Sequence, residues 1–183
     1  MRVRRKYIEQ LAEDLLDRNK VKKPHVVLAP LAKSLGLEII RQDADDSISG
    51  MLINEGKDKG GIIGVNRAHH KNRQRFTIAH EIGHFLLEHY HGVHFDGANT
   101  GLQINFRDER STTGEDVFER EANLFAAELL MPRSLLSADL AKIRGPVSLV
   151  DNNDKTLKDL AVRYQVSVRA ITYRLAYMGR LDL

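Results

Sequence analysis

The chain has 183 residues, of which 42% are hydrophobic and 29% are charged, and it contains no cysteine. This composition excludes a disordered chain, a collagen-like repeat and a disulfide scaffold, and the lack of thiols excludes cysteine catalysis and thiolate metal ligands. Lysine and arginine number 28 against 25 aspartate and glutamate residues, so the formal net charge is +3. That value is too small to indicate nucleic-acid binding by itself.

The sequence contains no segment typical of export or membrane insertion. Residues 1–9 carry several positive charges, but the apolar run of a signal peptide does not follow them. No stretch reaches the roughly 18 apolar residues that a membrane span needs. We therefore expect a cytoplasmic protein that has no membrane partner.

The first third of the chain predicts two helices followed by three strands. Apolar residues recur at helical spacing in residues 5–18 and 28–35, and Gly36 is placed to end the second helix. Short apolar runs separated by polar or glycine-containing turns predict strands at residues 37–40, 49–54 and 61–66.

The rest of the chain predicts mainly helices. A long helix at residues 72–90 is followed by a polar, glycine-containing loop at residues 91–114, within which residues 102–107 can form a strand. Residues 145–154 have the composition of a linker. Further helices are predicted at residues 115–130, 134–142, 157–164 and 168–177. We therefore expect an α+β protein with one domain at residues 1–144 and a helical segment at residues 155–183.

The long helix at residues 72–90 carries the strongest functional signal. His80 and His84 are four residues apart, so on a helix both imidazoles lie on one face and can bind one ion. Glu81 follows His80 directly and can reach a water molecule on that ion. This is the H-E-x-x-H arrangement of zinc metallopeptidases, in which the glutamate is the general base. The plainer alternative is a pair of surface histidines.

A catalytic zinc site needs a third protein ligand, and the helix at residues 115–130 offers two candidates. Glu119 lies toward the face that we expect to be buried, whereas Glu121 is rotated further from it. Asn123 lies one turn beyond Glu119, where its side chain can orient a ligating histidine. The pattern favours Glu119 as the third ligand and leaves Glu121 as an alternative.

Two segments resemble the active-site helices of the ImmA/IrrE family of metallopeptidases: FTIAHEIGHFLL at residues 76–87 and EREANLFAAELLMP at residues 119–132. The resemblance implies a zincin-like core, with a small sheet beside the H-E-x-x-H helix. It also implies that His80, His84 and Glu119 hold Zn²⁺ and that Glu81 is the catalytic base. A His-His-Glu set accepts Mn²⁺ as well, so manganese is the alternative metal.

The same resemblance implies a zinc-dependent endopeptidase that cleaves a helix-turn-helix transcriptional repressor. Cleavage would derepress the genes of a stress response or of a mobile element. The expected partner is therefore the repressor protein. Two alternatives stay open: a DNA-binding or partner-binding regulator with a vestigial or structural metal site, and a zinc-stabilised interaction module.

Substrate binding by such an enzyme needs a sheet edge beside the active-site helix, because an extended peptide can pair with an exposed strand. The predicted strand at residues 61–66 is the best candidate, and its glycines allow close backbone approach. The residues expected to line the peptide are Ile62, Ile63, Gly64 and Val65. Side chains that can donate to the oxyanion of the reaction are Tyr90, His91, His94 and Arg107, and the sequence does not distinguish among them.

The two helices predicted near the C-terminus resemble a helix-turn-helix in which Gln165 replaces the usual turn glycine. Residues 155–183 contain six basic and two acidic side chains, a local charge of +4. Arg163, Arg169 and Arg174 are therefore candidate contacts for nucleic acid or for a protein partner. The alternative, which we favour, is a helical pair that packs on the metallopeptidase core.

Overall fold

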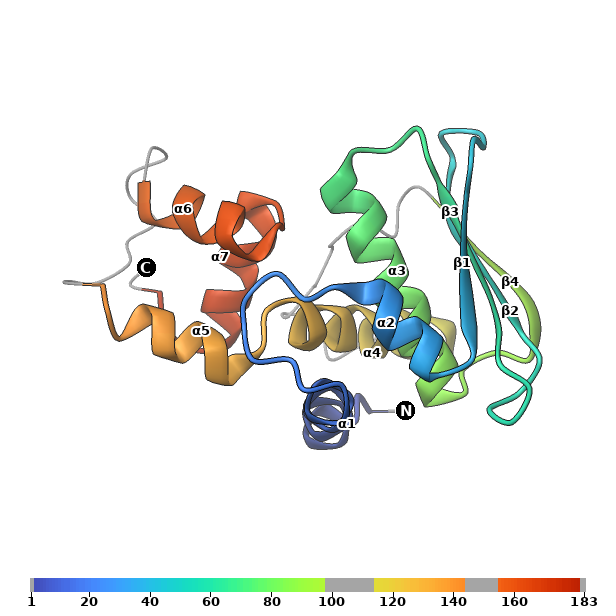
Figure 1. Ribbon diagram of the computed structural model, residues 1–183, viewed down its shortest axis with the longest axis horizontal. Coiled ribbons are helices and arrows are strands. Elements are labelled where there is room, and N and C mark those ends of the chain that lie inside the picture. Colours follow the sequence, from blue (N-terminus) through green and yellow to red (C-terminus); the bar gives the residue numbers. More distant parts are fainter. Residues whose placement is uncertain (1, 98–113, 144–154, 182–183) are drawn as a thin grey trace.

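The computed structural model describes residues 2–97, 114–143 and 155–181. In these ranges the chain has the expected α+β fold: a four-stranded sheet lies at one end, helices α5–α7 lie at the other, and α3 and α4 lie between them (Figure 1). The strands are β1 (Leu37–Gln42), β2 (Ile48–Asn54), β3 (Gly61–Asn66) and β4 (Gly92–Gly97). The helices are α1 (Arg5–Arg18), α2 (Leu28–Ser34), α3 (Lys71–Leu87), α4 (Gly114–Leu130), α5 (Arg133–Leu140), α6 (Lys155–Tyr164) and α7 (Val168–Tyr177).

The sheet is mixed, with the strand order β1-β3-β2-β4. Strand β1 runs parallel to β3, and β2 runs antiparallel to both β3 and β4. Leu52, near the middle of β2, pairs with Ile63 on one side and with His94 on the other. Among the described strands, β1 and β4 are therefore the two edges of this sheet.

This order corrects two predictions. Residues 62–65 were expected to offer a free edge to a peptide, but β3 pairs with β1 on one side and β2 on the other, so this expectation is wrong. Residues 92–97 were expected to belong to a loop, but they form the edge strand β4. The strand predicted at residues 102–107, together with Arg107, lies outside the described residues.

Helix α3 lies between the sheet and α4, and 12 of its 17 residues are buried. Two glycines permit this close packing. A Cβ atom on Gly50 of β2 would lie 2.3 Å from Thr77 Cγ2 and 3.1 Å from Glu81 Oε1. A Cβ atom on Gly83 would lie 3.1 Å from the ring of Phe125. Since neither atom is present, β2 and α4 both approach the segment of α3 that carries the H-E-x-x-H motif.

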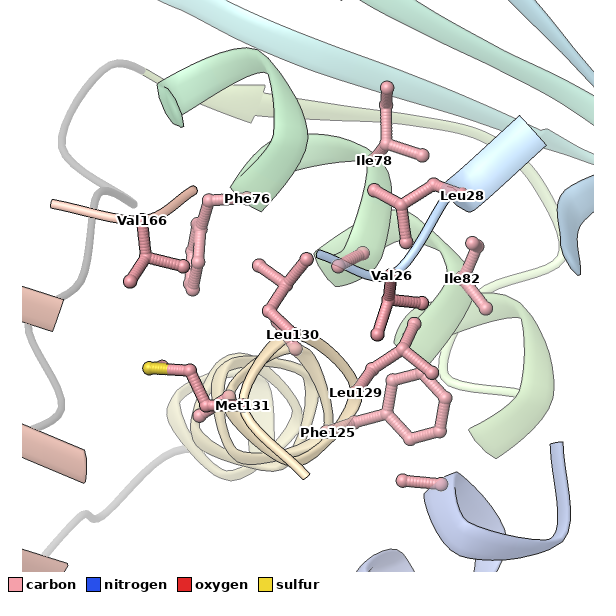
Figure 2. Packing of buried hydrophobic residues seen from close by; sticks show 14 of the residues in the cluster. Val26, Leu28, Phe76, Ile78, Ile82, Phe125, Leu129, Leu130, Met131 and Val166 are labelled. Carbon is pink, nitrogen blue, oxygen red and sulfur yellow. The ribbon is translucent and has the colours of Figure 1, made fainter. Parts of the chain in front are cut away.

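One hydrophobic cluster connects the elements of the molecule. Figure 2 shows Ile78 and Ile82 of α3 and Phe125 and Leu129 of α4 among the side chains of this cluster. Val166, in the turn between α6 and α7, belongs to the same cluster. The C-terminal helices therefore pack on the rest of the chain through apolar side chains. Among the described residues, no helix is both long enough and apolar enough to cross a lipid bilayer.

The turn between α6 and α7 explains how Gln165 replaces glycine. Gln165 has a φ of 51°, so this position adopts the left-handed conformation that glycine usually takes. Ser167 then begins α7 by accepting a hydrogen bond from the backbone N–H of Ala170. The local geometry is that of two short helices joined by a tight turn, as the sequence predicts.

The three arginines proposed for nucleic-acid or partner contact lie in different environments. The prediction for Arg174 is wrong, because its side chain is 1% exposed and forms an ion pair with Glu128. Arg163 is half exposed and forms an ion pair with Asp139. Arg169 is exposed and lies over the ring of Tyr173.

Candidate metal centre

The structure brings together His80 and His84 of α3 and Glu119 of α4. The Nε2 atoms of the two histidines are 2.8 Å apart. Glu119 Oε2 lies 3.3 Å from His80 Nε2, and Glu119 Oε1 lies 3.3 Å from His84 Nε2. A tetrahedral zinc ion with Zn–N distances of about 2.0–2.1 Å keeps its ligand atoms about 3.3 Å apart. The two histidine–glutamate distances match this spacing, and the two histidine nitrogens lie closer together than it, at 2.8 Å. The three side chains converge closely enough to share one ion, and their role as ligands stays a prediction.

Helical geometry decides which glutamate of α4 reaches this cluster. Glu119 points at the two histidines, whereas Glu121, two residues further along the helix, points at His89 and Arg4. Burial opposes ionisation of Glu119, but hydrogen bonds from His80 and His84 hold the pKa of its carboxyl well below the ordinary value. Glu119 is therefore an anion beside two imidazoles, which suits a divalent cation.

The two histidines of the cluster differ in their protonation. Burial and the nearby charge of His80 lower the pKa of His84 to about 3, so at neutral pH its ring is uncharged and offers a lone pair. Burial works against the charge on His80, but Asp96 and Glu119 raise its pKa to about 9. A bound cation would replace the proton that His80 holds between these carboxylates.

Glu81 is buried completely on the same helix, and neither of its carboxylate oxygens has a hydrogen-bond partner among the described residues. Burial, and then the charge of Asp96, raises the pKa of Glu81 well above its ordinary value. A buried carboxylate without a partner indicates that a group it serves, such as a polarised water molecule, belongs beside it. The residues present thus fit a metal-dependent hydrolase.

Strand β4 contributes two further polar side chains that the sequence interpretation missed or left unassigned. Asp96 Oδ2 lies 3.5 Å from His80 Nε2, and His94 Nε2 lies 3.8 Å from Glu119 Oε1. Tyr90 stacks on His94 at a ring distance of 3.7 Å and donates a long hydrogen bond to Glu119. The signal was present, since His94 and Asp96 alternate and so share one face if residues 92–97 form a strand.

The role expected for Asn123, orienting a ligating histidine, stays a prediction. Its Oδ1 atom and the Nδ1 atom of His80 are both buried, and neither has a hydrogen-bond partner in the described part of the chain. The ring nitrogen of His84 that faces away from the cluster instead contacts His89, at 3.0 Å. His91, another residue considered from sequence, is exposed and lies beside Glu88 at the surface.

A helix with an H-E-x-x-H motif beside a small mixed sheet, facing a carboxylate from the next helix, defines the zincin-like class of metallopeptidase folds. Within this class, the chain belongs to the Peptidase_M78 family, described as the IrrE N-terminal-like domain, whose model matches residues 32–176.

Two similar proteins carry the name radiation response metalloprotease IrrE. The one from Deinococcus radiodurans is 33% identical over 114 residues, which are 62% of this chain and 30% of that protein. The one from Deinococcus deserti is 36% identical over 115 residues, which are 63% of this chain and 36% of that protein. The chain therefore matches only about a third of the length of these relatives.

Two other matches extend further along the chain. A protein of Bacillus phage phi105, named uncharacterized immunity region protein 2, is 28% identical over 155 residues, which are 85% of this chain and 80% of that protein. A solved structure of a Mycobacterium tuberculosis transcriptional regulator covers 92% of this chain and 46% of its own, with a TM-score of 0.60 and 16% identity. At that identity the likeness supports the fold alone.

Proposed function

We propose that this chain is a zinc-dependent endopeptidase with His80, His84 and Glu119 as metal ligands and Glu81 as the general base. The observation that carries this proposal is the convergence of the side chains of His80, His84 and Glu119, whose donor atoms lie 2.8–3.3 Å apart. The buried, unpartnered carboxylate of Glu81 on the same helix supports it. Zn²⁺ is the expected metal, with Mn²⁺ as the alternative for this ligand set.

The chain's own residues divide the work of peptide hydrolysis. When bound, the metal ion would polarise a water molecule and lower its pKa. Glu81 would accept a proton from that water and later deliver it to the leaving amine. Burial raises the pKa of Glu81 above its ordinary value, which makes its carboxylate a stronger base than an exposed one.

Strand β4 replaces β3 as the proposed place for substrate. It is the sheet edge that carries His94 and Asp96 beside the cluster, so an extended peptide paired with its backbone would pass close to Glu119. Tyr90 and His94 both lie near Glu119, which makes them the better candidates for donating to the oxyanion.

The proposed substrate is a helix-turn-helix transcriptional repressor. The names of the relatives support this choice, since two are radiation response metalloproteases and one is an immunity region protein of a phage. Cleavage of a repressor would derepress genes, and such derepression would suit both a radiation response and a phage immunity region. The alternative of a DNA-binding regulator is weakened, because Arg174 is buried in an ion pair and Arg163 already pairs with Asp139.

The test is incubation of the zinc-loaded chain with the repressor encoded beside its gene, followed by mass analysis of the fragments. We expect one or a few defined cleavages, and none with Glu81→Gln, which should still bind zinc. An intact repressor under conditions in which zinc is bound would reject this substrate. Cleavage by Glu81→Gln at the wild-type rate would reject the role of Glu81.

A further inference from the structure

A chain of buried polar contacts extends from His84 to the N-terminal segment. His84 Nδ1 lies 3.0 Å from His89 Nδ1, and His89 Nε2 lies 3.0 Å from Glu121 Oε2. Arg4 donates to Glu121 from its backbone N–H at 2.8 Å and from its guanidinium Nε at 3.0 Å. The side chains of His89 and Glu121 are 1% and 2% exposed. These contacts join segments that are 117 residues apart in sequence.

The chemistry of the two imidazoles decides which atom donates and which accepts in each of these hydrogen bonds. If His84 Nε2 binds a metal ion, that nitrogen carries no proton, and the neutral ring must carry its proton on Nδ1. His84 Nδ1–H then donates to His89 Nδ1, which leaves the proton of His89 on Nε2. His89 Nε2–H in turn donates to the carboxylate of Glu121. In this arrangement each of the two N–H groups meets an acceptor.

Glu121 lies between His89 and Arg4 at the end of this arrangement. The backbone N–H and the guanidinium of Arg4 both donate to the carboxyl of Glu121, and His89 Nε2 contacts the same carboxyl. The relay therefore ends in a carboxyl group that forms an ion pair with Arg4. Arg4 lies outside residues 32–176, the segment that matches the family model.

Packing fixes the ring of His89 as well as its hydrogen bonds. Glu88 ends α3 in the left-handed conformation, with a φ of 55°, and the backbone N–H of His89 donates to the carbonyl of His84. This turn directs His89 back toward the helix. Phe118 of α4 stacks on the imidazole at a ring distance of 4.5 Å and an angle of 11°. His80 has no comparable support, since its Nδ1 lacks a partner in the described residues.

We propose that His89, Glu121 and Arg4 form a positioning relay that holds His84 in the tautomer and orientation required for metal binding, so that the N-terminal segment contributes to metal affinity. None of the three residues touches the cluster of His80, His84 and Glu119 except through His84. The proposal rests on the proposed function in one respect, namely that His84 Nε2 is a metal ligand. Partners of ligating histidines typically change metal affinity 10–100-fold when removed.

The test measures zinc affinity of the full-length chain by competition with a chromophoric chelator. We expect His89→Phe, which keeps the stacking on Phe118, and Glu121→Gln each to weaken zinc binding about 10–100-fold. The double variant should be little weaker than either single one, because both changes break the same relay. The matched substitutions His91→Phe and Glu13→Gln, at exposed sites, should leave the affinity unchanged.

Arg4 provides a graded readout. Arg4→Met should weaken binding by less than Glu121→Gln, because the backbone N–H of residue 4 still donates to the carboxylate. Arg4→Lys should bind zinc more tightly than Arg4→Met and nearly as tightly as the wild type, because lysine keeps the positive charge. If the three residues had a purely structural role, the metal-free variants would unfold at a lower temperature, and the absorption bands of the Co²⁺-substituted protein would stay unchanged. The relay predicts instead that these bands shift in His89→Phe.

The outcomes separate this proposal from the proposed function. Wild-type zinc affinity and an unchanged cobalt spectrum in folded His89→Phe and Glu121→Gln would overturn the relay alone. Failure of the wild-type chain to bind zinc, or an affinity that His80→Ala does not reduce, would overturn the metal site itself and the relay with it. Imidazole ¹⁵N shifts of the zinc-bound chain give a second measurement: the relay requires a protonated Nδ1 on His84, and a proton on Nε2 would contradict it.

Discussion

Glu119 and Glu121 lie two residues apart on α4, yet they serve different partners. Glu119 faces His80 and His84, whereas Glu121 faces His89 and pairs with Arg4. Both carboxyls have lowered pKa values although burial works against their charge, because each accepts hydrogen bonds from basic side chains. The helix thus presents one anion directly to the candidate metal site and a second anion behind it.

The first prediction, at the scale of one residue, concerns Glu119. Replacing it with glutamine removes an anionic ligand while keeping the shape of the side chain, so zinc affinity should fall by more than the about 10–100-fold expected for an outer partner. Chelator competition measures this loss, with Glu13→Gln as the matched control at an exposed site. An unchanged affinity in Glu119→Gln would mean that the third ligand is a different residue.

At the scale of elements, α7 is attached to α4 by a buried ion pair. Arg174 pairs with Glu128 and also donates to the backbone carbonyl of Met131, where α4 has just ended. Both side chains are almost fully inaccessible to water. The role of Arg174 is therefore to hold the C-terminal helices on the core.

The second prediction follows from this pair. Arg174→Met leaves Glu128 charged and buried, so the free energy of unfolding should fall by about 3–5 kcal/mol. Replacing both residues with apolar ones, Arg174→Met with Glu128→Leu, should recover most of that loss. Urea unfolding measures both, and Arg169→Met at an exposed position should change stability by less than about 0.5 kcal/mol. If Arg169→Met and Arg174→Met lowered the free energy of unfolding equally, the role of Arg174 in holding the C-terminal helices on the core would be contradicted.

The third prediction concerns the contact between α5 and α6, where Asp139 accepts hydrogen bonds from Arg163 and Tyr164. Burial opposes its charge, but these partners and Lys142 lower its pKa below the ordinary value of 3.8. A lowered folded-state pKa stabilises the fold above the unfolded pKa and loses that effect as the pH falls through the folded value. The free energy of unfolding of the wild type should therefore be about 1 kcal/mol higher than that of Asp139→Asn at pH 7.

That difference should begin to shrink as the pH falls below the ordinary pKa of 3.8 and should approach zero below the lowered pKa of the folded state. Urea unfolding of both proteins at pH 7 and near pH 3 measures the change. Because all other groups are shared, the difference between the two proteins isolates Asp139. A difference that is as large at pH 3 as at pH 7 would show that the carboxylate charge does not stabilise this contact.

At the scale of the whole molecule, the candidate metal centre joins side chains from three different elements. His80 and His84 come from α3, Glu119 from α4, and Asp96 from β4. A bound ion would therefore connect the sheet-facing helix to the helix behind it. Binding to the folded state alone stabilises that state by mass action.

The fourth prediction is that metal removal lowers global stability. At a free zinc concentration about 1,000 times the Kd, the bound ion should add about 4 kcal/mol to the free energy of unfolding, and a chelator should remove it. Differential scanning calorimetry with and without chelator measures the shift. His80→Ala should show no such shift, and an equal shift in that variant would indicate that zinc binds elsewhere.

Part of the fold and site could be predicted because the signals are local. The four-residue spacing of His80 and His84 places both rings on one face of any helix, and the same periodicity turns Glu119 toward the buried side of its own helix. The pairing of β4 with β2 could not be predicted in this way, since Met51 and Phe95 are far apart in sequence and a short polar run does not specify its neighbour.

The amino-acid sequence by itself determined the metal-binding pattern, the α+β class and the two short C-terminal helices, because spacing and helical periodicity operate within a few residues. Only the tertiary structure decided which of the described strands lie at the edges of the sheet, that Arg174 is buried, and that Glu121 supports His84 through His89. These features depend on contacts between segments as distant as Arg4 and Glu121. Whether such segments meet is settled by the packing of the complete core.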